Sequence, residues 1–148
     1  MSVSVVVLAA GKGTRMKSDL PKVLHEVLGK PILTHALDAL SFIENKYVVV
    51  GHESDMVINL LPTSTKHILQ KNQLGTGHAV STVVSDKLFA ENKSEFTLVI
   101  PGDVPAIDTE DIHHLISEVK TKTSSVGFLT SKVKNPHGYG RIVRNNEE

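Results

Sequence analysis

The sequence has 148 residues, the usual size of one domain, and no cysteine, which excludes disulfides, thiolate catalysis and cysteine-ligated zinc. Basic and acidic residues number 16 each, so no excess charge would draw the chain to nucleic acid or to an anionic membrane surface. No apolar run could cross a bilayer, and no basic segment precedes the first apolar run as in a signal peptide, so we expect a cytoplasmic protein without membrane insertion.

The first half of the chain is predicted to alternate between strands and helices. Residues 3–8 are almost all apolar and β-branched, which is typical of a strand covered on both faces. A helix then follows Pro31, and its apolar stripe consists of Ile32, Leu33, Ala36, Leu37, Leu40 and Ile43. Residues 47–50 predict a second buried strand that ends at Gly51, and residues 56–61 predict a short helix stopped near Pro62.

The second half continues the same alternation. A third strand is predicted over 67–70 and a fourth over 96–100. Between them a helix opens at Gly75, with an apolar stripe of Val80, Val83, Val84 and Leu88. Asp108 predicts the N-cap of a further helix, whose core face is Ile112, Leu115, Ile116 and Val119. A fifth strand over 126–133, a turn over 135–138 and a sixth strand over 139–143 complete the prediction.

This alternation predicts a Rossmann-like α/β fold, in which a mostly parallel sheet carries helices on both faces. Ligands of such sheets bind outside the carboxyl ends of the strands. Three polar or glycine-rich segments follow predicted strand ends, namely residues 9–16, residues 70–76 and Asp103. We therefore expect these three segments to meet at one edge of the sheet and to hold one ligand.

The first of these segments has the composition of a phosphate-binding loop. Gly11 and Gly13 remove two side chains from the turn, so backbone N–H groups can approach an anion. The two glycines are too close together for a Walker loop, and Met16 stands where a dinucleotide-binding loop needs its third glycine. Arg15 offers a planar fork of donors and Lys22 a compact positive charge, and both suit phosphate oxygens.

The run Leu-Ala-Ala-Gly-Lys-Gly-Thr-Arg-Met at 8–16, followed after four residues by Pro21-Lys22, resembles the signature of the sugar nucleotidyltransferases (nucleotide-sugar pyrophosphorylases). The resemblance extends from Val5 to about Arg144 and is strongest to the uridyltransferase domains of bifunctional bacterial enzymes that also carry an acetyltransferase β-helix. It implies transfer from UTP to N-acetylglucosamine 1-phosphate, which yields UDP-N-acetylglucosamine and pyrophosphate, with Mg²⁺ as cofactor. We expect the sequence to cover only the N-terminal portion of such a domain, over 1–148, and to lack the β-helix.

The resemblance also implies a role for each matching residue. Arg15 and Lys22 are implied to be catalytic, and Asp103 to hold the metal ion. The implied nucleotide-binding residues are Leu8, Ala9, Ala10, Gly11, Gly13, Lys22, Gln70, Gly75 and Thr76, and the implied substrate-binding residues are Pro101, Gly102, Asp103 and Gly140. Pro101 departs from the relatives, which often carry tyrosine there, so a ligand contact at this position stays open.

Simple chemistry agrees with these roles but does not require them. The Gln70 amide can pair with a pyrimidine edge, and the Asp103 carboxylate can hold Mg²⁺ while phosphates fill other coordination positions. Gly75 could instead only cap a helix, Asp103 could cap its own turn, and Lys22 could be a solvated surface cation. The expected partners are UTP and a sugar 1-phosphate but no nucleic acid, and the formation of a homo-oligomer stays open.

Two alternatives to the uridyltransferase remain at this stage. The chain could bind nucleotide without catalysis, or it could belong to a cytidylyltransferase or guanylyltransferase relative. The combination of Gln70 with Gly75 and Thr76 favours uridine, and Val23 stands where one group of cytidylyltransferases usually has glutamine. An activity assay with UTP, Mg²⁺ and N-acetylglucosamine 1-phosphate separates catalysis from binding alone. Competition between UTP, CTP, GTP and dTTP, with and without Mg²⁺, tests the base and the metal site together.

Overall fold

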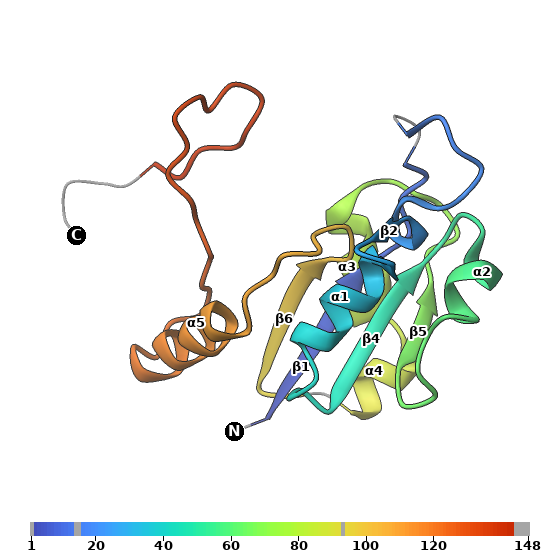
Figure 1. Cartoon of the computed structure of the whole chain (residues 1–148). Coiled ribbons are helices and arrows are strands. Elements are labelled where there is room, and N and C mark those ends of the chain that lie inside the picture. Colours follow the sequence, from blue (N-terminus) through green and yellow to red (C-terminus); the bar gives the residue numbers. More distant parts are fainter. Residues whose placement is uncertain (1, 14–15, 93, 144–148) are drawn as a thin grey trace. The chain divides into compact units, whose positions relative to one another are not determined.

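The computed structural model describes residues 2–13, 16–92 and 94–143 (Figure 1). The chain divides into two compact units, Met1–Ile107 and Asp108–Glu148. Arg15 and Thr14 of the expected phosphate loop lie outside the described residues. Every other predicted site residue except Gly140 belongs to the first unit, which is therefore the unit that carries the candidate site.

The first unit is built on a four-stranded parallel sheet. Its strands are β1 (Val3–Leu8), β4 (Asn45–Val50), β5 (Lys66–Leu69) and β6 (Phe96–Pro101), in the order β5-β4-β1-β6. The strand β1 lies in the middle, and its residues 5–7 are almost completely buried, as expected of a β-branched run covered on both faces. The four strands predicted up to residue 100 are therefore confirmed.

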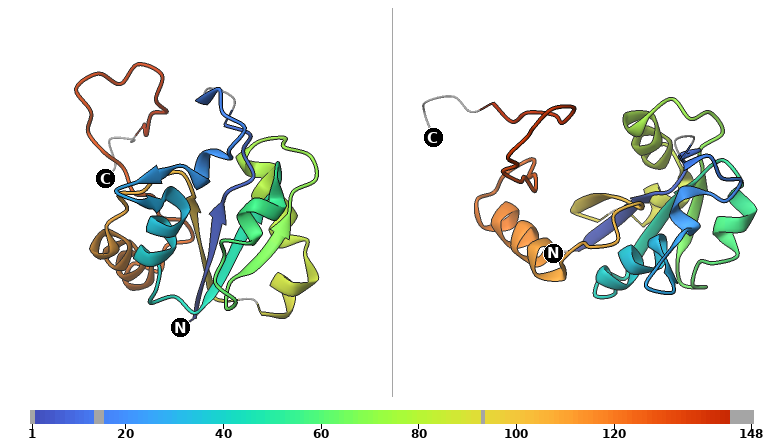
Figure 2. Two further views of the ribbon diagram at one scale, coloured as in Figure 1. Left: turned by 45° about the vertical axis from the view of Figure 1, so that its right-hand side comes forward. Right: turned by 45° about the horizontal axis from the view of Figure 1, so that its top comes forward.

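Helices cover both faces of this sheet, which confirms the predicted α/β class. The view on the right of Figure 2 shows α1 (Ile32–Ala39) and α3 (Thr76–Val84) on opposite sides of the strands. On the α3 side the core consists of Val6, Ala10, Tyr47, Val49, Ile68, Ala79, Val83 and Phe89. On the other side, a Cβ added at Gly102 would lie 3.2 Å from Val7 and 3.3 Å from Leu33 of α1, so both side chains pack against Gly102.

Two predicted helices differ from the observed ones. The helix expected from Gly75 through Leu88 is two helices, α3 and α4 (Lys87–Glu91), because the Asp86 side chain accepts a hydrogen bond from Leu88 N at 2.8 Å and starts a new helix. Val84 of the predicted stripe is 60% exposed. The short helix expected over 56–61 is α2 (Ser54–Ile58), and single turns continue it as far as Leu61.

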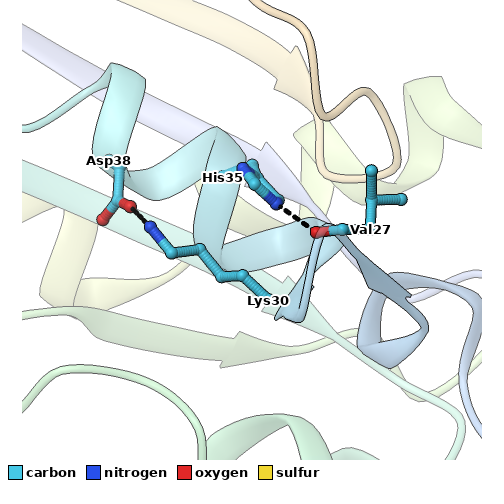
Figure 3. A network of polar contacts seen from close by, with 4 residues as sticks. All are labelled: Val27, Lys30, His35 and Asp38. Carbon is cyan, nitrogen blue, oxygen red and sulfur yellow. Dashed lines mark hydrogen bonds and ion pairs between the residues drawn. The ribbon is translucent and has the colours of Figure 1, made fainter.

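A small hairpin that the sequence did not predict follows Lys22. The 3₁₀ turn η2 (Lys22–Leu24) leads into it. The hairpin itself consists of the two-residue strands β2 (Glu26–Val27) and β3 (Lys30–Pro31), which are too short for an alternating pattern. Two polar contacts attach it to α1, as Figure 3 shows: an ion pair between Lys30 and Asp38, and a 2.8 Å hydrogen bond from the His35 ring to the Val27 carbonyl. The hairpin thus fixes the path of the chain directly after Lys22.

The second unit contains α5 (Thr109–Thr121), and the predicted cap is confirmed because Asp108 accepts a hydrogen bond from Glu110 N at 2.8 Å. The predicted strands over 126–133 and 139–143 are wrong. The apolar side chains of these stretches are exposed, and the described part of the chain offers them no hydrogen-bonded neighbour, without which a strand does not form. The turn between them is confirmed by the bond from Tyr139 N to the Pro136 carbonyl.

The helices give no sign of a membrane-spanning segment. Within the described ranges, every helix is too short or too polar to traverse a bilayer.

Candidate functional site

The candidate site lies at the carboxyl edge of the sheet, where the ends of three strands are held side by side. Leu8, the last residue of β1, pairs with Val49 of β4 and with Pro101 of β6. The hydrogen bonds continue one residue further, because Ala9 N donates to the Val49 carbonyl at 2.9 Å and Gly102 N donates to the Leu8 carbonyl at 2.8 Å. The segments after β1 and β6 therefore begin next to each other.

Gly51 brings the segments after β1, β4 and β5 together. A Cβ added at Gly51 would lie 2.9 Å from the Ala10 carbonyl oxygen and 2.8 Å from the Gln73 Nε2. Only glycine permits this approach, since real Cβ contacts are longer. The sequence predicts Gly51 as the end of a strand but did not predict this close approach. Its position directly after a buried strand, like that of Gly102, is the signal that could have revealed it.

Lys22 and Asp103 meet at this edge although 81 positions separate them. The Lys22 Nζ donates a 2.7 Å hydrogen bond to Asp103 Oδ2, and the two side chains are 39% and 37% exposed. Gly13 allows the loop to fold back onto Lys22, because it has φ +59° and a Cβ there would lie 2.8 Å from the Lys22 Cβ. A partly exposed cation and carboxylate therefore stand beside the glycine loop, within reach of solvent.

Gln70 organises the loop that opens α3. Its side chain is 3% exposed, and its Nε2 donates to the Gly75 carbonyl at 3.3 Å and lies 2.9 Å from the His78 Nδ1. The backbone carbonyl of Gln70 accepts a 3.0 Å hydrogen bond from Gln73 Nε2. Gly75 has φ +102° and is exposed, with open space where a side chain would stand. The backbone of this loop is therefore exposed to solvent at Gly75, and the buried Gln70 amide holds the loop in place by its hydrogen bond to the Gly75 carbonyl.

The other predicted site residues differ in how far they are exposed to solvent. Ala9 and Ala10 are buried, so a ligand could reach only their backbone, whereas Gly11 is exposed with open space around it. Gly102 is buried against the Leu8 carbonyl, and Pro101 is exposed. Gly140 lies exposed in the second unit, and its expected contact with the sugar stays a prediction.

This arrangement suits an anionic ligand with a flat polar group. The glycine loop and Lys22 supply N–H groups and positive charge, which bind phosphate oxygens. The open backbone at Gly75 can receive a base. Among the described residues, no three histidine or acidic side chains gather closely enough to hold a metal ion by themselves, so a metal here would also need oxygens from the ligand or water.

Known proteins resemble this chain in sequence and in fold. The bifunctional protein GlmU of Lactococcus lactis subsp. cremoris is 47% identical over 150 aligned residues, which cover 100% of this chain but 32% of that protein. The solved structures share the fold at lower identity. Rv0371c of Mycobacterium tuberculosis, in a complex with manganese, has a TM-score of 0.61 at 17% identity, with 82% of this chain and 61% of that one covered.

A second solved structure, HddC of Yersinia pseudotuberculosis complexed with GMP-PN, has a TM-score of 0.59 at 24% identity and covers 80% of this chain and 54% of that one. The chain thus spans about a third of the length of the curated relative and more than half of these structures. The model of the MobA-like NTP transferase domain matches residues 5–144, nearly the whole sequence. The chain therefore belongs to the MobA-like NTP transferase domain family.

Proposed function

We propose that this chain binds UTP and supplies the nucleotide-binding part of a uridyltransferase that acts on N-acetylglucosamine 1-phosphate. The observation that carries the proposal is the meeting of Lys22, Asp103 and the Gln70–Thr76 loop at one edge of the sheet. The 47% identity to the bifunctional GlmU protein favours this branch of the family over its cytidylyl and guanylyl branches. The products are UDP-N-acetylglucosamine and pyrophosphate.

The base is assigned to the loop of residues 70–76. The fold by itself leaves the base open, since a structural neighbour, HddC, carries GMP-PN. The Gln70 amide can hydrogen-bond to the edge of a uracil, while the exposed Gly75 and Thr76 offer backbone groups and a hydroxyl. The buried amide holds this loop in place before any ligand arrives, which lowers the entropic cost of binding.

The phosphates are assigned to the loop of residues 9–13, together with Arg15 and Lys22. The open space at Gly11 admits a phosphate close to the backbone N–H groups. Lys22, held by Asp103 and by its contact with Gly13, stands ready to donate to phosphate oxygens. Arg15 adds its guanidinium fork in this proposal.

Asp103 fits a divalent cation that is shared with the ligand. Its carboxylate follows a strand end, is partly exposed and uses Oδ2 for Lys22, and Mg²⁺ is commonly held by one or two carboxylates plus substrate phosphates. A structural neighbour, Rv0371c, was obtained in complex with manganese. We assign Mg²⁺ to Asp103, where it would neutralise charge on the triphosphate.

The chain's own contribution to the reaction is positioning and charge. A phosphate oxygen of the sugar 1-phosphate attacks the α-phosphorus of UTP in line, the bond from that phosphorus to the β-phosphate bridging oxygen breaks, and pyrophosphate leaves. Lys22 and Arg15 donate hydrogen bonds to the phosphate oxygens on which negative charge increases. Gln70 and the backbone at Gly75 hold the base still, so the α-phosphate is presented in one orientation.

The first test is competition between UTP, CTP, GTP and dTTP for the full 148-residue chain, with and without Mg²⁺. UTP is expected to bind at least about tenfold tighter than CTP, a factor that one lost hydrogen bond can produce, and Mg²⁺ is expected to strengthen its binding. Equal affinity for the four nucleotides, or no binding, would contradict the proposal. The second measurement is pyrophosphate release with N-acetylglucosamine 1-phosphate.

Binding of UTP without turnover is the second candidate, and pyrophosphate release is the measurement that separates it from the transferase. Tight UTP binding with no pyrophosphate would select this candidate. Pyrophosphate release that depends on both substrates would select the transferase.

A further inference from the structure

We propose that His78 is a specificity-determining residue that fixes the orientation of the Gln70 amide, so that the site accepts pyrimidines with an N3–H group and rejects cytosine. This inference rests on the proposed function, because it concerns the base-binding part of the same site. It assigns a role to His78, which lies in the first turn of α3 and which the chemistry described above does not use.

The Gly75 carbonyl determines which end of the Gln70 amide faces the loop. An amide side chain can take two orientations that differ by exchange of its oxygen and its nitrogen. A backbone carbonyl can only accept a hydrogen bond, so the end 3.3 Å from the Gly75 oxygen must be the NH₂ group. The reversed orientation would place two oxygens against each other in a side chain that is 3% exposed.

His78 completes the arrangement by taking the second N–H of the same amide. Its Nδ1 lies 2.9 Å from Gln70 Nε2, and it can accept only when the ring proton of the neutral imidazole is on Nε2. Both amide N–H groups are then used within the protein, and the shorter of the two bonds is the one to His78. The Gln70 amide has only its oxygen left to offer to a ligand.

An amide that offers only an acceptor discriminates between the pyrimidines. Uracil and thymine carry a donor at N3, which can pair with the Gln70 oxygen. Cytosine carries an acceptor at N3, and two acceptors facing each other in a partly desolvated site cost more than a lost hydrogen bond. His78 thus acts on the base through Gln70 and need not touch the ligand itself.

The test compares two substitutions at one position. His78→Leu removes the acceptor while keeping the bulk, so only the longer bond to Gly75 resists reversal of the amide. We expect the ratio of UTP to CTP affinity to fall about tenfold, mainly through tighter CTP binding. His78→Asn places an acceptor oxygen near the position of Nδ1 and is expected to restore most of the ratio. His67→Leu, an exposed histidine on β5, is the matched control and should leave the ratio unchanged.

A measurement without nucleotide tests the same arrangement separately. Long-range proton–nitrogen NMR of the intact chain is expected to show neutral His78 with its proton on Nε2 and an unprotonated Nδ1. A proton on Nδ1 would overturn the proposal, because that nitrogen could not accept from Gln70. Thermal unfolding of each variant checks that the chain remains folded.

The outcomes separate this proposal from the function on which it rests. If the unmodified chain selects UTP and His78→Leu keeps the full selectivity, the role of His78 is wrong while the proposed function stands. If the unmodified chain binds no UTP, both are wrong. A fall in selectivity with His78→Leu, its recovery with His78→Asn, and the Nε2–H form of the ring together support the proposal.

Discussion

Replacement of Lys22 by alanine is expected to weaken UTP binding about 10- to 100-fold and to leave the fold intact. A hydrogen bond to a charged group contributes about 1.5–3 kcal/mol, which corresponds to this range of affinity. Alanine keeps the Cβ that packs against Gly13, so the path of the loop is preserved. Asp103 loses its partner but is already 37% exposed in the unmodified chain, and partly exposed ion pairs add little to stability. Titration calorimetry with UTP and Mg²⁺ measures the effect.

The matched control for this variant is Lys30→Ala. Lys30 also forms an ion pair with an aspartate, Asp38, at comparable exposure, but it belongs to the hairpin that attaches to α1 (Figure 3). The Lys30–Asp38 pair lies outside the proposed site, and a surface ion pair contributes less than ~1 kcal/mol to stability. Its loss is therefore expected to leave UTP affinity within about twofold. Equal affinity in Lys22→Ala and the unmodified chain would remove Lys22 from the proposed site.

Substitution of Gly11 by alanine is expected to reduce UTP affinity at least about tenfold without lowering the melting temperature. Alanine fits the unliganded chain, because nothing lies within 4 Å of the position of the added Cβ. If a phosphate occupies that open space, the methyl group displaces it, and overpacking of this kind costs about 1–3 kcal/mol. Calorimetry and thermal unfolding of the same sample measure the two quantities.

Gly13→Ala is the comparison for Gly11→Ala, because it is expected to disturb the unliganded loop as well as the binding of UTP. Here the backbone has φ +59° and the added Cβ would lie 2.8 Å from the Lys22 Cβ, so alanine disturbs the loop even without ligand. We expect a lower melting temperature in addition to weaker binding. Unchanged UTP affinity in Gly11→Ala would show that the phosphates lie elsewhere.

The sheet could be predicted because its strands carry strong signals. Short apolar runs rich in β-branched residues, such as residues 3–8 and 47–50, are typical of buried strands, and the helices between them favour parallel pairing. The strands expected over 126–133 and 139–143 failed for a physical reason. Strand propensity describes how a side chain fits a sheet surface, and no neighbouring strand in the described residues supplies that surface. The break at Asp86 was missed because a capping side chain competed with a continuous apolar stripe.

The location of the site at the carboxyl edge of the sheet could be predicted from the sequence, but the contacts between its side chains could not. The rule that ligands bind at the carboxyl ends of parallel strands brings residues 9–13, residues 70–76 and Asp103 together, and the structure places them so. The pairing of Lys22 with Asp103 depends on the return of the glycine loop, and sequence spacing does not specify that path. The bond between Gln70 and His78 likewise depends on the shape of one tight turn.

The most direct test of the account is a map of backbone amide shifts while UTP and Mg²⁺ are added to the 148-residue chain. The account predicts that the largest shifts fall together in residues 9–13, residues 70–78 and residues 102–103, and that they saturate at one common UTP concentration. Shifts confined to one of these segments, or strongest on α2 or in the hairpin of residues 26–31, would contradict a single nucleotide site at this edge of the sheet.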